Sequence, residues 1–322
     1  MKRAVMMCMT AAAWLVLGAA PLLSQSAGST HLVIITGVSG EPRIGTQWHG
    51  MAMALATAAA DRFAIASDNV IVLAEDSTRD APRVKGRSTK VTIERVLGGL
   101  ARSLTAADRL LVIVIAHGSS LSGAARVNLP GPDMTAADFA RVLGPAIQPT
   151  IAFVQTGSAS GDFATALAGP RRIVITATKS AREQNETIFP GPFVRALTTD
   201  AGDADKDGRV SLLEAFTFAK QEVEQVFTQG NLLPTEHAVL WDGADGGRAR
   251  SFQLATSASS SGGAQSAVAQ VALAAVQLRI DALRARRSTI SEDAYLAALE
   301  PLMVELAERM RALRNNAGVL KP

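Results

Sequence analysis

The sequence contains almost no cysteine: the only one among its 322 residues is Cys8, which lies in an apolar run close to the N-terminus. Cysteine supplies the sulfur of disulfides and the thiolate of thiol enzymes. Beyond that run, the chain can therefore form no disulfide of its own and cannot act as a thiol enzyme. A domain of more than about 200 residues buries enough apolar surface to fold without disulfides, and the hydrophobic content of 48% is ample for such a core.

The N-terminus has the pattern of a secretory signal. Lys2 and Arg3 precede a largely apolar run of about 18 residues, and small residues follow it within 24–27. We therefore expect residues 1–27 to be a signal peptide, cleaved during export, which predicts a periplasmic or secreted protein. The alternative is an uncleaved anchor helix, because a run of this length can just cross a bilayer. Only in that case do we expect contact with a membrane.

The chain carries little net charge. The formal value for the full sequence is +3, and it falls to about +1 without Lys2 and Arg3. A nearly neutral chain gives no electrostatic argument for nucleic-acid binding, so we expect no nucleic-acid partner. No segment after the N-terminal run is long and apolar enough to cross a membrane.

The rest of the chain divides into three parts by composition. Residues 28–254 alternate short apolar runs with amphipathic segments, whereas 255–266 consist mostly of Ser, Gly and Ala and predict a flexible linker before a helical tail, 267–322. The runs predict strands at His31–Thr36, Asn69–Leu73, Leu110–Ala116, Thr150–Val154 and Arg172–Thr176, and the segments predict helices at Thr46–Phe63, Thr89–Leu104 and Thr135–Leu143. Such alternation predicts an α/β fold, a doubly wound and mainly parallel sheet flanked by helices.

The tail has apolar residues at steps of three and four, which predicts two amphipathic helices joined near Ser288–Glu292. A helical hairpin is the natural arrangement, and Pro301 should kink the second helix or delay its start. We expect the hairpin to pack against itself, or against a second copy as a coiled coil. The alternative is that it binds a helix of another protein.

Two strand ends carry the groups that acyl-transfer chemistry uses. The predicted strand Leu110–Ala116 ends in His117-Gly118, and the next one ends in a turn of small residues that contains Ser158. Successive parallel strands tend to be neighbours, so the imidazole and the small-residue turn should meet at one edge of the sheet. A His beside a hydroxyl, with Gly N–H groups nearby, can support nucleophilic catalysis.

These elements resemble the clan of caspases and legumains, and most closely the bacterial legumain-like, caspase-domain proteins. The resemblance covers about residues 30–250 and includes the stretches Asn128–Asp133, Arg171–Thr178, Glu236–Asp242, Gly243 and Asp245–Gly247. The tail, with Tyr295 and Leu299-Glu300, resembles the C-terminal extension of a bacterial subgroup. The resemblance implies a caspase-like fold and a peptidase-like site that recognises a protein or peptide ligand.

Carried over residue by residue, the resemblance assigns the general base to His117 and an oxyanion-hole N–H to Gly118. Ser160-Gly161 matches the Ser-Gly of the clan's turn, and Ser158 stands where the clan has its catalytic cysteine. A serine hydroxyl is far less acidic than a thiol and needs a well-aligned base with a third, orienting group. Three interpretations stay open: a non-catalytic pseudo-peptidase that binds a ligand, a serine-dependent hydrolase that uses Ser158 and His117, and a different chemistry or a purely structural role.

The most specific motif is a twelve-residue calcium loop from Asp203 to Glu214, which matches the EF-hand pattern at every position. The expected ligands are side-chain oxygens and one backbone carbonyl, from Asp203, Asp205, Asp207, Arg209 (carbonyl), Ser211 and Glu214. Gly208 allows the sharp turn that the loop requires. We expect helices on both sides, a short one at Phe193–Thr199 and a longer one at Leu212–Phe227.

Calcium binding has one competing interpretation: the same carboxylates could form an acidic N-terminal cap of the second helix without a metal. An exported protein meets a calcium-rich exterior, which favours the metal. The sequence thus predicts Ca²⁺ as the only cofactor.

Overall fold

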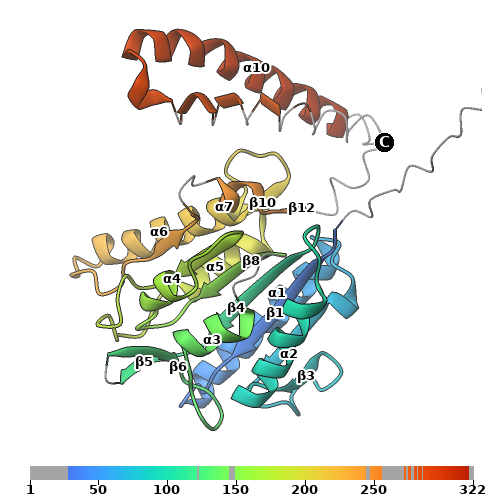
Figure 1. Cartoon of the computed structure of the whole chain (residues 1–322), viewed down its shortest axis with the longest axis vertical. Helices are drawn as coiled ribbons and strands as arrows, with labels where there is room; N and C mark the ends of the chain where they lie inside the picture. Colours follow the sequence, from blue (N-terminus) through green and yellow to red (C-terminus); the bar gives the residue numbers. More distant parts are fainter. Residues whose placement is uncertain are drawn as a thin grey trace, which may run out of the picture.

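The computed structural model of the chain describes residues 28–121, 123–144, 149–243 and 247–255 and, with gaps, 272–318. The predicted signal peptide, 1–27, and the part of the predicted linker after Ala255 lie outside these residues. A seven-stranded sheet with the order β11-β9-β8-β4-β1-β2-β3 occupies the centre of 28–255 (Figure 1). Neighbouring strands are parallel, except that β11 runs antiparallel to β9.

The elements follow the predicted alternation closely. The strands of the large sheet are β1 (Thr30–Thr36), β2 (Val70–Ala74), β3 (Val84–Arg87), β4 (Arg109–Ile115), β8 (Thr150–Gln155), β9 (Arg172–Thr176) and β11 (Val239–Trp241). The helices of residues 28–255 are α1 (Pro42–Asp61), α2 (Lys90–Ser103), α3 (Ala136–Leu143), α4 (Asp162–Ala166), α5 (Pro190–Thr198), α6 (Leu212–Gln229) and α7 (Arg248–Ser251), with 3₁₀ turns at Ser67–Asn69 (η1) and Asp200–Gly202 (η2). The predicted doubly wound, mainly parallel α/β sheet is therefore confirmed.

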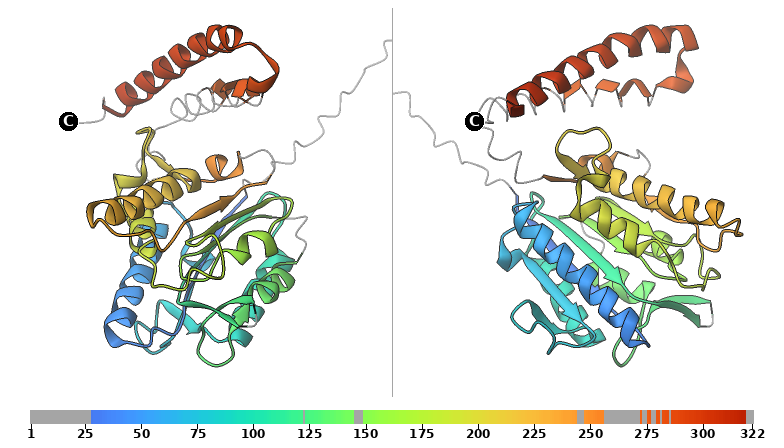
Figure 2. Two further views of the ribbon diagram at one scale, coloured as in Figure 1. Left: turned by 90° about the vertical axis from the view of Figure 1, so that its left-hand side faces the viewer. Right: turned by 180° about the vertical axis from the view of Figure 1, so that it is seen from behind.

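Helices cover both faces of the sheet because its strands are apolar on both sides. In β4, alternate residues such as Leu111 and Ile113 pack under α1, α5 and α6, whereas Leu110 and Val112 pack under α2, α3 and α4. Figure 1 is seen from the side of α2 and α3, and the right-hand view of Figure 2 from the side of α1 and α6.

The strand order places a topological switch point between β1 and β4. From β1 the chain adds β2 and β3 on one side, then returns to form β4, β8 and β9 on the other. Ligands of doubly wound sheets bind outside the carboxyl ends of the strands at such a point. His117 follows β4 at this point, and Ser39 follows β1.

Two small sheets accompany the large one. Strands β5 (Gly118–Leu121), β6 (Ala124–Val127) and β7 (Met134–Thr135) form an antiparallel meander directly after His117. Strand β10 (Arg209–Ser211) pairs antiparallel with β12 (Gln253–Ala255), so Ala255, the first residue of the predicted linker, belongs to a strand. None of these short strands was predicted, because each has only two to four residues and no continuous apolar run.

The tail contains a 3₁₀ turn, η3 (Arg287–Thr289), and the long helix α10 (Glu292–Gly318). Helix α10 begins at Glu292 and continues through Pro301, so the proline does not delay its start. Val276 and Ile280 pack on Leu302, and Arg279 forms an ion pair of 2.7 Å with Glu305. None of the helices in the described residues is long and apolar enough to span a bilayer.

Candidate functional site

The loops that follow β4 and β8 meet at the carboxyl edge of the sheet, as the sequence indicates. Two glycines make this approach possible. A Cβ atom on Gly118 would lie 2.0 Å from the carbonyl oxygen of Ser158, and one on Gly157 would lie 1.8 Å from that of Ala116. Any side chain at either position would drive the two backbones apart.

The Ser158 hydroxyl is engaged with the backbone of Gly118. Its Oγ donates to the Gly118 carbonyl oxygen at 2.8 Å and accepts from the Gly118 N–H at 3.3 Å. Ser158 is only 4% exposed. A hydroxyl has one proton to donate, so in this geometry the Ser158 proton is directed to a carbonyl and not to an imidazole.

His117 is oriented by groups other than Ser158. Its Nε2 lies 3.3 Å from the carbonyl oxygen of Ser39, which can only accept, so this nitrogen carries the hydrogen. Its ring meets Trp48 edge to face, with 4.7 Å between centroids. Among the described residues, no hydrogen bond joins His117 to Ser158. The structure thus brings the two loops together, with the His117 and Ser158 side chains bonded to different backbone groups.

The Glu75 carboxylate binds Ser39, the residue whose carbonyl oxygen faces His117. One carboxylate oxygen accepts from the N–H of Ser39 at 3.1 Å and from its hydroxyl at 2.9 Å. Sequence reasoning missed Glu75, Ser39 and Trp48. Ser39 and Glu75 follow strands without any motif, and the apolar spacing of the first helix explains Trp48 as a core residue.

A cleft of about 230 Å³ lies beside this group, between the carboxyl ends of β1 and β2 and the start of α1. Its walls include Thr46, Trp48, His49, Glu75 and Arg79. His49 lines the cleft and forms a 2.6 Å contact with Asp80. The cleft therefore offers aromatic, cationic and anionic groups next to His117.

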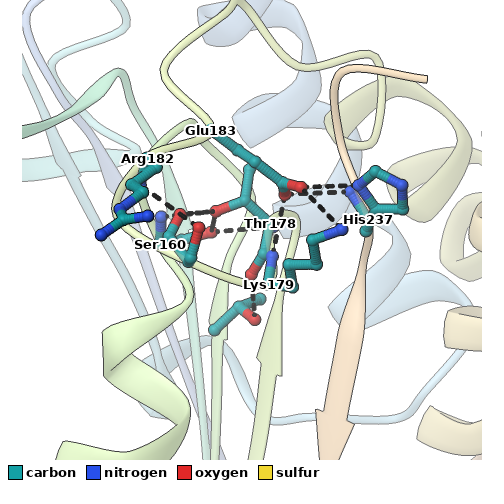
Figure 3. A network of polar contacts seen from close by, with 8 residues as sticks. Ser160, Thr178, Lys179, Arg182, Glu183 and His237 are labelled. Carbon is teal, nitrogen blue, oxygen red and sulfur yellow. Dashed lines mark hydrogen bonds and ion pairs between the residues drawn. The ribbon is translucent and has the colours of Figure 1, made fainter. Parts of the chain in front are cut away.

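A polar network braces the turn that carries Ser158 (Figure 3). The Ser160 and Thr178 hydroxyls lie 3.0 Å apart, and the Ala159 N–H donates to the carbonyl oxygen of Glu183 at 2.7 Å. The Glu183 carboxylate in turn contacts Nδ1 of His237 at 2.6 Å. Ala159 has a φ of +51°, a left-handed conformation that such bracing maintains. Ser160 is fully buried, and its hydroxyl accepts from the Thr178 N–H at 3.1 Å.

Glu236, beside His237, binds the start of α5. Its carboxylate accepts from the N–H groups of Ile188 at 2.8 Å and Phe189 at 3.2 Å. Burial raises the pKa of the Glu236 carboxyl to about 7. The stretch that resembles the caspase clan here, Glu236–Asp242, therefore holds the loops around the Ser158 turn and then adds β11 to the sheet.

The predicted calcium loop folds into a compact turn between η2 and α6. Carboxylate oxygens of Asp203, Asp205 and Glu214 lie within 4.8 Å of one another. The backbone turns left-handed at Lys206 (φ +60°) and at Gly208 (φ +81°). Glycine adopts this conformation without strain, which explains the Gly at the sixth position of the loop.

Backbone hydrogen bonds fix the acidic side chains of this loop. Asp203 accepts from the N–H groups of Asp207 at 3.1 Å and Gly208 at 3.0 Å. Burial and the neighbouring carboxylates, chiefly that of Asp205, raise the pKa of Asp207 to about 7. A divalent cation among these oxygens would remove the repulsion, so the donor set fits Ca²⁺, a hard ion that prefers oxygen ligands.

The loop also forms the helix cap that was the alternative interpretation. The Ser211 hydroxyl accepts from the Glu214 N–H at 3.1 Å, and the Glu214 carboxylate accepts from the Ser211 N–H at 2.8 Å. This capping box begins α6. Glu214 serves both interpretations: its Oε2 caps the helix, its Oε1 accepts from the Ala204 N–H at 3.2 Å, and its carboxylate belongs to the acidic cluster.

Comparisons with known proteins add little to this geometry. A scan against protein-family models gives no match, and neither does a search of the curated proteins. Among solved structures, the chain is similar to the crystal structure of caspase-1 from Spodoptera frugiperda, with 12% identity, a TM-score of 0.43 and coverage of 67% of this chain and 87% of that one. The structure of pro-sf-caspase-1 gives 10% identity, a TM-score of 0.40 and coverage of 67% and 91%. Likeness at this level identifies no activity.

Proposed function

We propose that this chain is an exported caspase- and legumain-like protein without a catalytic cysteine, which acts as a calcium-binding pseudo-peptidase and binds a peptide or protein ligand. The observation that carries the proposal is the Ser158 hydroxyl. It gives its proton to the Gly118 carbonyl and is buried. The residue in the nucleophile's place thus acts as a structural tie between two loops.

The competing hydrolase would need a different arrangement of the same groups. A serine nucleophile must donate its proton to the base, and the oxyanion hole must be open to the substrate. Here the hydrogen on His117 Nε2 faces the Ser39 carbonyl, and the Gly118 N–H is directed at Ser158 Oγ. Both donors are engaged within the protein, which supports binding without turnover.

The cleft beside His117 is the proposed ligand site. It lies at the carboxyl ends of β1 and β2, on the sheet edge where doubly wound sheets bind ligands, and Trp48 both lines it and contacts the His117 ring. Its volume of about 230 Å³ fits one or two side chains of a peptide and not a folded partner. Thr46→Trp, a change at an exposed lining position of α1, should fill the cleft and abolish ligand binding while the sheet stays intact.

Calcium is proposed to stabilise the far side of the domain. The ion would be held by Asp203, Asp205, Asp207, Ser211 and Glu214 with the Arg209 carbonyl. The loop leads into β10, which pairs with β12 near the end of the domain. Calcium there would fix the start of α6 and this strand pair, and we assign it no part in chemistry.

A serine-directed phosphonate probe on the mature protein tests the proposal. We expect no covalent adduct on the wild type, and equal background on Ser158→Ala and His117→Ala. Calorimetry on the same preparation should show uptake of one Ca²⁺. Labelling that disappears in both variants would establish the serine hydrolase instead. Absence of calcium uptake, with an unchanged melting temperature after chelation, would remove calcium from the proposal.

A further inference from the structure

A second cleft opens at the edge of the sheet opposite to His117, where β9 begins. Its volume is about 310 Å³. It lies between the ends of α3 and α4 and the segment that enters β9. The lining residues are two arginines and otherwise small or apolar ones: Ala140, Arg141, Gly144, Ala166, Leu167, Ala168, Gly169, Pro170 and Arg172. None of them is acidic.

Arg172 brings a buried positive charge to this cleft. Its exposed fraction is 4%, and its Nη2 donates to the carbonyl oxygens of Leu143 at 3.0 Å and Gly144 at 2.6 Å. Its Nη1 has no hydrogen-bond partner among the residues that the structure describes. The carbonyls at the end of α3 attract a cation through the helix dipole, but only with about half a charge. A buried guanidinium usually has a full counter-charge as well.

In the part of the chain that the structure describes, no carboxylate supplies that counter-charge to Arg172. Burial lowers its pKa to about 10, and no neighbouring acid acts in the opposite direction. The other arginine of the cleft, Arg141, is already compensated, because it contacts Glu94 at 2.6 Å and Asp138 at 3.3 Å. Residues 145–148, which follow Gly144 in the sequence, contain no Asp or Glu. The cleft therefore has one uncompensated positive charge.

We propose that this cleft binds the carboxylate of a small ligand with a short apolar body, with Arg172 as the counter-ion. A single uncompensated charge matches a monoanion better than the dianion of phosphate. The side chains of the alanines, Leu167 and Pro170 offer apolar contacts for the rest of the ligand and no hydrogen-bond donors for further oxygens. The site is separate from the switch point, so its occupancy does not depend on the proposed function.

The test uses butyrate as the probe, with acetate, phosphate and chloride at the same pH and ionic strength. Butyrate should raise the melting temperature of the mature protein by about 3–6 °C at a tenfold excess over its dissociation constant. Acetate should bind more weakly, because it lacks the apolar chain, and phosphate should act no differently from chloride. Calorimetry then gives the dissociation constant directly.

Two variants distinguish a ligand-binding role of Arg172 from a purely structural role. Arg172→Met keeps the apolar stem and should abolish the butyrate response. Ala166→Leu keeps the guanidinium but narrows the cleft, so it should raise the dissociation constant of butyrate at least tenfold. This second variant keeps the test decisive if Arg172→Met fails to fold. Arg171→Met, next in the sequence, should bind butyrate like the wild type. An equal response to phosphate, a response that persists in Arg172→Met, or no butyrate response in the wild type would overturn the proposal.

Discussion

The calcium loop and the edge that carries His117 present their functional groups in opposite ways. In the loop, every expected ligand comes from twelve consecutive residues, and three carboxylates converge within 4.8 Å. At the His117 edge, the groups follow three different strands, and both His117 Nε2 and Ser158 Oγ are directed at backbone carbonyls. In the loop, carboxylate oxygens cluster where a cation could bind. At the His117 edge, the imidazole N–H and the Ser158 hydroxyl are already hydrogen-bonded within the protein. The two regions therefore differ in what they offer a ligand: the loop offers clustered oxygens, whereas the edge offers a serine that is bonded to backbone.

The largest predicted effect concerns the close approach at the His117 edge. Gly118→Ala places a Cβ atom 2.0 Å from the Ser158 carbonyl oxygen, so a backbone must move. We expect a loss of about 3 kcal/mol or more in unfolding free energy, measured by denaturant titration.

Gly50 supplies the matched control. It lies exposed in α1, and a Cβ atom added there would meet no other atom within 4 Å, so Gly50→Ala should stabilise the protein by about 0.5–1 kcal/mol. If the Gly118 variant unfolds within about 0.5 kcal/mol of the wild type, the loops do not meet as described.

The next effect concerns the calcium loop. At a hundredfold excess over its dissociation constant, calcium should add about 2.7 kcal/mol to the unfolding free energy, and a chelator should remove it. Glu214→Gln should lose most of this gain but keep its stability without calcium, because glutamine also completes a capping box. Glu224→Gln, exposed on the same helix, should respond to calcium like the wild type. A chelator that leaves all three proteins unchanged contradicts the metal site.

The difference between the two regions also explains which features could be predicted from the sequence and which could not. The long apolar strands, the helices and the Asp203–Glu214 loop are local patterns, so they could be predicted from residue spacing. The position of Ser158 beside Gly118 could be predicted from the order of parallel strands, but the direction of its hydroxyl could not. The hydroxyl is bonded to the backbone of Gly118, and Glu183 holds its turn from beyond β9. The orientation of His117 depends on Ser39 and Trp48, which come from distant parts of the chain.

The smallest predicted effect separates a structural serine from a catalytic one. Ser158→Ala should cost about 1–2 kcal/mol, the value of a buried hydroxyl bonded to backbone. Because no hydrogen bond joins these two residues within the described structure, the cost should add to that of His117→Ala within about 0.5 kcal/mol in a double-mutant cycle. A coupling energy above about 1 kcal/mol would mean that the two side chains form the dyad after all.

Peptide cleavage tests the central claim most directly. The mature protein, saturated with calcium, is incubated with a degenerate peptide library, and new peptide termini are identified by mass spectrometry. The account predicts that the wild type produces no cleavage beyond that of the Ser158→Ala and His117→Ala variants, although peptides bind to it. A set of cleavages made by the wild type and absent from both variants would contradict it.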